Sequence, residues 1–205
     1  MKKLPILLSE GTRKKIIMLA KRPWVRRKLE GQRKLHLGCG SNVIKEWANI
    51  DLERKGAVIG WDLTDPLPVR SETVELIYCE HFIEHITLKQ AKELLSECYR
   101  VLCPSGILRL STPNLKKLVD EYCSGRTMEW GDMGWNPVTP CQMLNDGLRL
   151  WGHQFVYDTE ELIHTLWEIG YSKVTRVAWR ESTTAALANL ECRPFHGEII
   201  LEATK

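Results

Sequence analysis

Short apolar runs alternate with polar turns along most of the chain and predict a series of buried strands. The runs lie at residues 34–40, 47–52, 56–63, 74–80, 107–112, 173–179 and 198–204. Each has the length of a strand, and several are followed at once by glycine or by an acidic residue. Seven strands are therefore expected.

Two segments between these runs have the spacing of an amphipathic helix. The first begins at Thr87, which with Gln90 makes a capping box, and its apolar positions continue until Pro104 ends the pattern. The second begins at Asp158 and ends at Gly170. Strands that alternate with helices predict an α/β fold with a parallel sheet covered on both faces.

In such sheets ligands bind outside the carboxyl ends of the strands, so the residues there are the first candidates for a site. Those residues are Gly38–Asn42, Asp51, Asp62, Cys79–Glu84 and Ser111–Asn114. A dinucleotide site would need three glycines and an acidic residue about 20 positions later. The chain has only Gly38 and Gly40, and Asp51 comes 13 residues after Gly38. A ligand with one ribose and no phosphate therefore fits better.

Taken in order, the segments KLHLGCGSN, NID, WDLTDPLP, VELIYCEHFIEHI and YRVLCPSGILRLSTPN resemble the class I S-adenosylmethionine-dependent methyltransferases. The chain is especially similar to those members whose first strand reads LHLGCG. The resemblance covers residues 34–114 and returns in the last helix and strand. It implies a doubly wound, Rossmann-like sheet of seven strands, mostly parallel with an antiparallel last strand, and S-adenosylmethionine as the cofactor.

The resemblance also implies roles for the residues at the strand ends. Gly38 and Gly40 would line the methionine part of the cofactor, Asp51 would hold the ribose, and Asp62 with Leu63 would border the adenine. The residues expected to bind the cofactor are His36, Gly38, Gly40, Asn42, Asp51, Leu52, Asp62, Leu63, Glu80 and His81.

The chain departs from the family pattern at two positions. His36 stands where an acidic residue is common, and Asn42 replaces the third glycine. Only six residues separate Asn42 from Asn49, so the usual first helix should be short or absent.

Residues 80–86 read EHFIEHI and contain the H-x-x-E-H pattern of one group of zinc proteases at His81, Glu84 and His85. Those enzymes need both histidines on one helical face and a third protein ligand. Here the pattern begins in the turn between a strand and the capping residue Thr87. We therefore expect no metal, and a zinc hydrolase is a remote alternative.

Residues 113–157 form an unusually long connection rich in tryptophan and methionine, and we predict a lid that forms the acceptor pocket. The alternative is a structural insert whose tryptophans pack on the sheet. The candidate substrate-binding residues are Trp130, Trp135, Asn145, Asp146, Trp151 and His153. Asn189, Glu191 and Arg193 of a second connection could add to the same rim.

The expected reaction is direct displacement of the methyl group onto a hydroxyl or amine of a small molecule or a cell-surface sugar precursor. A hydroxyl acceptor needs a general base, for which His81 and His153 are the candidates, whereas a neutral amine needs only positioning. The alternative from another class is a module that binds S-adenosylmethionine or a partner without catalysis.

Charge divides the 205-residue chain into a basic arm, residues 1–33, and one domain, residues 34–205. Residues 1–34 hold twelve Lys or Arg against two Glu and carry +10, so the remainder of a chain with net charge +3 carries −7. The arm could bind anionic membrane or nucleic acid, or it could be a solvated helix packed on the body. The residues expected to pack it are Ile16, Ile17, Leu19 and Trp24.

Two further observations bear on location. Seven cysteines form no C-x-x-C pair, which is typical of free thiols in a reducing compartment. Neither a run of about 18 to 20 apolar residues nor a signal-peptide pattern occurs. A cytoplasmic protein is expected, with the membrane surface as an alternative if the arm binds lipid.

Overall fold

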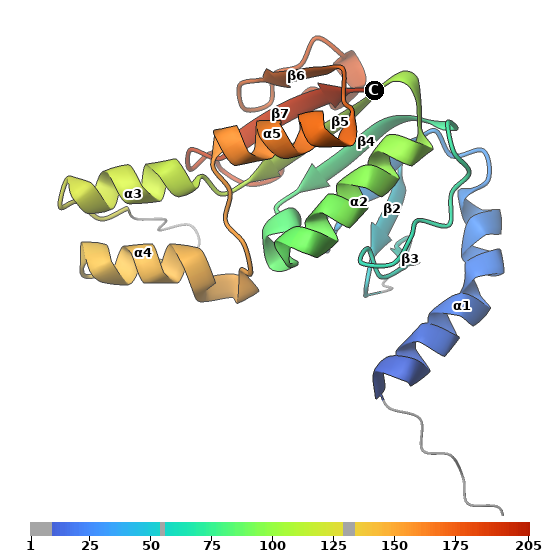
Figure 1. Ribbon diagram of the computed structural model, residues 1–205, viewed down its shortest axis with the longest axis horizontal. Helices are drawn as coiled ribbons and strands as arrows, with labels where there is room; N and C mark the ends of the chain where they lie inside the picture. Colours follow the sequence, from blue (N-terminus) through green and yellow to red (C-terminus); the bar gives the residue numbers. More distant parts are fainter. Residues whose placement is uncertain (1–9, 54–55, 129–133) are drawn as a thin grey trace, which may run out of the picture.

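The computed structural model describes residues 10–53, 56–128 and 134–205, with side chains described from residue 20 onward. A seven-stranded sheet in the order β3-β2-β1-β4-β5-β7-β6 forms its centre (Figure 1). The strands are β1 (Lys34–Leu37), β2 (Ala48–Asp51), β3 (Ile59–Gly60), β4 (Val74–Glu80), β5 (Leu102–Thr112), β6 (Lys173–Arg176) and β7 (Ile199–Thr204). Every predicted apolar run overlaps one of them. Two bounds differ clearly, because β3 has only two residues and β5 already begins at Leu102.

The helices are α1 (Glu10–Leu29), α2 (Leu88–Val101), α3 (Leu115–Cys123), α4 (Pro140–Arg149) and α5 (Thr159–Ile169). Short 3₁₀ turns form η1 (Ile83–His85), η3 (Leu150–Gly152) and η4 (Ala185–Leu187). The predicted caps are confirmed: Thr87 and Gln90 make a capping box, the Asp158 side chain accepts from the Glu161 amide, and Gly170 ends α5 in the left-handed region. Residues 38–47 form only turns and bends, which confirms that the usual first helix is missing.

The predicted direction of the strands is also confirmed. β1 to β5 pair in parallel, and β7 runs antiparallel to both β5 and β6. Thr112 at the carboxyl end of β5 is therefore opposite Ile199 at the start of β7. The residues just before β7 consequently lie at the same edge of the sheet as the carboxyl ends of the parallel strands.

One face of the sheet is apolar and carries the main core. Leu35, Leu37, Ile77 and Leu108 point to this face and belong to one buried cluster with residues of α2 and α5. Figure 1 shows these two helices lying side by side across the sheet. Because these strand residues alternate with side chains on the opposite face, the core accounts for only half of the strand positions.

The opposite face carries a row of polar side chains in register across the sheet. Asn49, His36, Tyr78, Arg109 and Glu202 are paired in that order from β2 to β7, and all five are at most 8% exposed. The coil between β6 and β7 helps to cover the row. Glu191 of this coil forms an ion pair with Arg109, at 2.6 Å, and the coil's Leu187 joins a small cluster with Tyr78.

The predicted lid is a helical pair and not an irregular loop. α3 and α4 lie side by side and extend from the carboxyl edge of the sheet (Figure 1). Their own small core contains Leu118, Trp135, Met143 and Val156. Trp135 therefore packs inside the insertion, and the expectation of an insert with this tryptophan on the sheet is wrong.

The basic arm is helical over α1, which packs on the body through Val25 and Leu29. Val25 and Leu29 are buried in the main core, whereas Trp24 is 43% exposed with the Lys28 ammonium 4.2 Å from its ring centre. The side chains of Ile16, Ile17 and Leu19 lie outside the described residues. Among the described helices none is long and apolar enough to cross a membrane. Contact of the arm with anionic lipid or nucleic acid stays a prediction.

A pair of charged side chains on α2 fastens the chain between β3 and β4. Arg100 Nε and Nη2 donate to the two carboxylate oxygens of Glu97, at 2.7 and 2.8 Å, and Arg100 also donates to the carbonyls of Leu67 and Val69. Glu97 in turn accepts from the Leu67 amide at 2.8 Å. Both members of this ion pair therefore bind the backbone of the connection between β3 and β4.

Glu97→Gln is expected to lower the free energy of unfolding by about 1–2 kcal/mol at neutral pH, because it weakens charge-assisted hydrogen bonds. Burial acts to raise the pKa of Glu97, but the hydrogen bond and the charge of Arg100 outweigh it and lower the pKa. This stabilisation is present above the ordinary carboxyl pKa and is lost as pH falls through the lowered one. Urea titrations should show the difference shrinking in acid.

The matched control is Glu93→Gln on the same helix. The Glu93 side chain is 58% exposed, and its ion pair with Lys89 is long, at 3.9 Å. This variant should change stability little. Equal losses in both variants, or a Glu97→Gln effect that persists in acid, would contradict the role given to the pair.

Candidate functional site

The loop after β1 is held by contacts from β2 and from the loop after β4. Gly40 N donates to Asp51 Oδ2 at 2.9 Å, so the acid at the end of β2 supports the glycine turn. Gly38 has φ +65°, and a Cβ there would lie 2.6 Å from the Phe82 ring. A side chain at position 38 would therefore meet both backbone strain and a clash. The strand-end residues predicted to bind the cofactor are brought together here.

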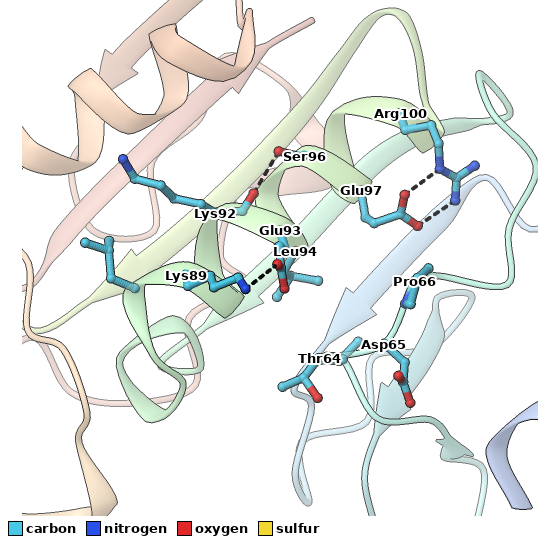
Figure 2. A pocket seen from close by; sticks show the side chains of 12 residues that line it. Thr64, Asp65, Pro66, Lys89, Lys92, Glu93, Leu94, Ser96, Glu97 and Arg100 are labelled. Carbon is cyan, nitrogen blue, oxygen red and sulfur yellow. Dashed lines mark hydrogen bonds and ion pairs between the residues drawn. The ribbon is translucent and has the colours of Figure 1, made fainter. Parts of the chain in front are cut away.

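Asp62 and Leu63 continue this edge beyond β3. The Asp62 carboxylate accepts from the Thr64 amide and hydroxyl, at 2.9 and 2.7 Å, and fixes the turn. Leu63 is buried, whereas Leu52, also predicted to contact the cofactor, is 68% exposed. A groove with a volume of about 790 Å³ runs from Leu63 along α2 to Arg100, and Figure 2 shows charged side chains of α2 along its wall.

Three other predicted cofactor residues make contacts within the protein. His36 is enclosed on the polar face, with Nδ1 3.0 Å from Asn49 Oδ1 and its ring against Tyr78. The Glu80 carboxylate accepts from the amide and thiol of Cys192. Asn42 closes the glycine turn through its amide, which donates to the Cys39 carbonyl at 2.8 Å.

His81 lies at the carboxyl end of β4 between two carboxylates. Its Nδ1 is 3.1 Å from Glu84 Oε1, and its Nε2 is 3.8 Å from Glu198 Oε1. The His81 backbone has φ +48°, an uncommon conformation outside glycine that is often found at functional sites. Its amide donates to the Ser111 carbonyl at 3.0 Å, which attaches the residue to β5.

Glu84 is fully buried and ionised. Its Oε2 accepts from the Thr112 hydroxyl at 3.0 Å, while Oε1 faces His81. Burial alone would raise the pKa of this carboxyl, but the hydrogen bond and the charge of His81 outweigh burial and hold the pKa below its ordinary value. A buried carboxylate behind an imidazole fixes both the orientation and the tautomer of the ring.

The candidate substrate residues of the insertion divide into two groups. Trp135 Nε1 donates to Asp146 Oδ2 at 3.1 Å, so these two stabilise the helical pair. Asn145 is exposed on α4 and bonds to Cys141 of the same helix. Trp130 lies outside the described residues. Among the candidates that the structure describes, Trp151 and His153 line a cavity against the body of the protein.

That cavity lies between the insertion and the residues before β7. Besides Trp151 and His153, its wall includes Lys117, His196 and Glu198. The last three were not predicted from the sequence. Glu198 could have been found, because it directly precedes a strand that the family resemblance makes antiparallel, which places it at the carboxyl edge.

Glu191, expected at the acceptor rim, lies in the polar layer below it. It is 3% exposed, and its carboxylate binds the Arg109 guanidinium. Glu191 also lines a small cavity together with His81 and Arg193, so its place at the acceptor rim stays a prediction.

The H-x-x-E-H pattern does not form the helical zinc site of a protease. η1 covers only Ile83–His85, and His81 precedes it in the left-handed region. The two histidines therefore do not share a helical face. His85 instead lies beside His153 of the insertion, with ring centres 5.1 Å apart.

Comparison with known proteins agrees with this geometry. Residues 35–110, from β1 into β5, match the family described as "Methyltransferase domain". No curated protein sequence matches the chain.

Several solved structures have a similar fold. A SAM-dependent methyltransferase from Archaeoglobus fulgidus is 17% identical with a TM-score of 0.52, over 96% of this chain and 100% of that one. A possible histamine N-methyltransferase from Thermotoga maritima is 15% identical with a TM-score of 0.53, over 94% and 97%. An S-adenosylmethionine-dependent methyltransferase from Mesorhizobium loti is 16% identical with a TM-score of 0.51, over 91% and 98%. At these identities the likeness concerns the fold.

Proposed function

The chain belongs to the class I S-adenosylmethionine-dependent methyltransferases, and on that premise we propose that it methylates a hydroxyl of a small polar molecule, such as a sugar precursor, held between the strand ends and the insertion. The observation that carries the proposal is the place of His81. It lies at the carboxyl edge of the sheet with a buried, ionised carboxylate on one ring nitrogen and Glu198 of the cavity wall near the other.

S-adenosylmethionine supplies an activated methyl group, and the residues around the glycine turn fit its parts. Gly40 has open space beside its backbone for the methionine moiety, whereas Gly38 packs against the Phe82 ring and shapes the loop. The Asp51 carboxylate accepts one backbone bond through each oxygen, from Gly40 and Glu53, and each oxygen keeps a lone pair for a ribose hydroxyl. The adenine would lie toward Asp62 and Leu63, where the groove of Figure 2 begins.

The acceptor would enter beside the insertion. The cavity there has a volume of only about 20 Å³, so the insertion would have to move away from the residues before β7 to admit an acceptor. The cavity wall offers an indole, imidazoles, a lysine and a carboxylate, a combination suited to a ligand with several hydroxyls and one stacking face. Bound S-adenosylmethionine would supply the methyl group, which the acceptor oxygen would take by direct displacement of the neutral thioether. The proton of the acceptor hydroxyl passes to His81 Nε2. The enzyme's other task is to hold the reactants in line without water.

Glu84 is a positioning residue in this scheme. It accepts from His81 Nδ1–H, so the lone pair of the neutral imidazole is on Nε2, which is 3.8 Å from Glu198 of the cavity wall. His153, the second candidate base, has Nδ1 at 2.9 Å from the Gly147 carbonyl. Burial lowers the pKa of His153, only partly opposed by that bond, and its ring lies farther from β4. We therefore assign the role of general base to His81 and regard His153 as a residue that lines the pocket.

Asp51→Asn is expected to weaken S-adenosylmethionine binding about 10- to 100-fold, because it removes a charged acceptor from the ribose hydroxyls. Calorimetric titration with the cofactor and with its demethylated product measures the change. An analogue of the demethylated product that lacks the 2′-hydroxyl tests whether Asp51 contacts the ribose or only supports the glycine turn. If Asp51 binds that hydroxyl, the losses from the variant and from the analogue should not add.

Asp120→Asn is the matched control, since Asp120 pairs with Lys116 on the outside of α3. It should bind the cofactor like the unchanged protein. Unchanged affinity in a folded Asp51→Asn variant would show that the ribose site has been misplaced, and strictly additive losses would limit Asp51 to supporting the loop.

A further inference from the structure

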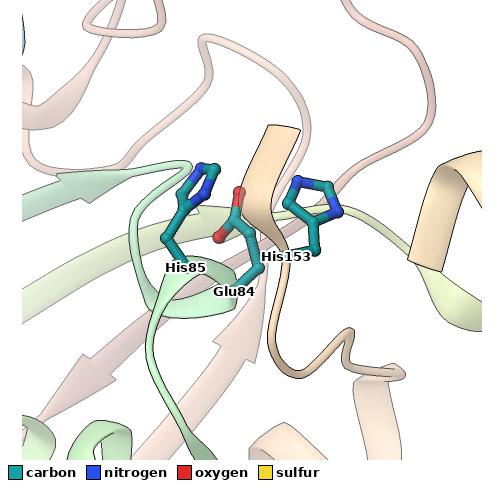
Figure 3. A group of neighbouring side chains, drawn as sticks. All are labelled: Glu84, His85 and His153. Carbon is teal, nitrogen blue, oxygen red and sulfur yellow. The ribbon is translucent and has the colours of Figure 1, made fainter. Parts of the chain in front are cut away.

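Glu84, His85 and His153 form a group that the methyl-transfer scheme does not fully use. One potential ligand atom from each lies within 4.8 Å of the other two. Figure 3 shows the Glu84 carboxylate between the two imidazole rings, one from the turn after β4 and the other from the end of the insertion. We propose that these three residues bind a divalent first-row transition metal such as Zn²⁺ at the junction of the insertion and the body.

The donor set defines the class of metal. Two imidazoles and one carboxylate are a frequent ligand set for zinc and for related ions that keep a coordination position open. Mg²⁺ and Ca²⁺ prefer oxygen ligands throughout, so two imidazoles disfavour them. The metal would therefore have three protein ligands and at least one position for water or for an oxygen of another molecule.

His153 is already oriented as metal-binding histidines usually are. Its Nδ1 is 2.9 Å from the Gly147 carbonyl, which requires the proton on Nδ1 and leaves the lone pair on Nε2. In Figure 3 one ring nitrogen of His153 points toward Glu84 and His85 and the other points away. The hydrogen bond to the Gly147 carbonyl therefore fixes the orientation of the His153 ring in the absence of a metal.

Glu84 can contribute an oxygen without losing its other partners. Its carboxylate accepts one bond from His81 and one from Thr112, whereas two carboxylate oxygens offer about four lone-pair positions. Hydrogen bonds to a coordinating carboxylate are usual in metal sites. The same residue can therefore orient His81 and bind the ion.

The group needs only a small contraction. Zinc with bonds of about 2.0–2.1 Å holds tetrahedral ligand atoms about 3.4 Å apart, so the widest pair must approach by at most about 1.4 Å. His85 and His153 are only partly buried, and Gly152 next to His153 has φ +80°. Small rotations of the two rings can provide this approach.

The consequence for the enzyme rests on the proposed function. The metal would fasten the insertion to the turn that carries His81, and its open position would be near the cavity that His153 lines. An acceptor oxygen bound there would be held near the methyl group and would lose its proton more readily.

Zinc titration of the chelator-treated full chain, without cofactor or acceptor, tests the site. One Zn²⁺ per chain should bind saturably, and His85→Ala and His153→Ala should each weaken binding at least tenfold. His164→Ala, on the outside of α5 with a side chain 63% exposed, should bind like the unchanged protein. Substitution of Co²⁺ should give the visible absorption of a site with nitrogen and oxygen ligands, lost in the His153 variant.

His81→Gln distinguishes this site from the linear H-x-x-E-H pattern. Because His81 bonds to the Glu84 carboxylate but supplies no ligand atom, its variant should weaken metal binding less than His85→Ala and His153→Ala do. Failure of the folded chain to bind zinc, or loss of binding in His81→Gln but not in His153→Ala, would overturn the proposal. The circular dichroism of each variant shows that it is folded. Since no methyl transfer is measured, the outcome is independent of the proposed function.

Discussion

Arg109→Met is expected to lower the free energy of unfolding by about 3–5 kcal/mol, the usual cost of breaking a buried ion pair. The Arg109 side chain is 0% exposed. Its Nε donates to Glu191 Oε1 and its Nη1 to Glu202 Oε1, both at 2.7 Å, and Nη1 also donates to the Glu181 carbonyl. Methionine fills much of the volume but leaves two carboxylates without their cation. Urea unfolding at neutral pH measures the loss.

The triple variant Arg109→Met, Glu191→Gln, Glu202→Gln is the decisive companion. It removes the uncompensated charges together with the guanidinium, so a large part of the lost stability should return. Arg33→Met is the control, because the Arg33 side chain is 58% exposed in its pair with Glu75 and should matter little. Similar stability losses in the single and triple variants would mean that packing, and not buried charge, explains the effect.

His81→Gln is expected to lower kcat about 100- to 10 000-fold with a hydroxyl acceptor, the range over which general bases act. Glutamine keeps a polar group of similar length but cannot accept and retain the proton at neutral pH. The acceptor is first identified by screening with methyl-labelled cofactor, and kcat and the Kd of the cofactor are then measured for each variant. The Kd of the cofactor should differ by less than about threefold from that of the unchanged protein, because the lost contact acts in the reaction step and not in cofactor binding.

Three comparisons make this prediction specific. Added imidazole should restore part of the activity of a His81→Ala variant, because the missing group is an imidazole. Glu84→Gln should reduce kcat less than His81→Gln does, since it leaves the ring in place but alters its orientation. His164→Gln should have no effect. A His81→Gln enzyme with normal kcat would show that the acceptor needs no base from this residue, as a neutral amine would not.

The two largest effects arise in adjacent layers of the same molecule. Arg109 lies within β5 on the polar face of the sheet, and Ser111 and Thr112 follow on the same strand toward His81 and Glu84. The coil that supplies Glu191 leads on to Glu198 in the cavity wall. The buried ion pair therefore anchors the segment that closes one side of the proposed acceptor site, and a loss of acceptor affinity in Arg109→Met would be consistent with this arrangement.

Local pattern was sufficient for the seven strands, for α2 and α5 and for the strand-end residues, but not for α3 and α4. The seven apolar runs, the capping box at Thr87 and the stop at Gly170 depend on neighbours in sequence, and the structure has all of them. The position of Asp51 beside the glycine turn followed as well, because parallel strands bring their carboxyl ends to one edge.

The interpretation of the long insertion succeeded only in part. The described residues of this segment form α3 and α4, but composition could not assign each side chain to a surface. Trp135 and Asp146 bind each other inside the helical pair, while Trp151 lines the cavity. Which side of a helix faces a partner depends on how the two helices pack, and no local pattern specifies that packing.

The sequence by itself determined the seven strands, the helices α2 and α5, the glycine turn and the acids near the ends of β2 and β3, because hydrophobic periodicity and capping act over a few residues. Only the tertiary structure decided which distant groups meet. Arg109 pairs with residues 82 and 93 positions away, Glu198 comes beside His81 through the reversed β7, and His153 joins Glu84 and His85 from the insertion. Such contacts depend on strand register and on the docking of separate segments, so chain spacing carries no direct signal for them.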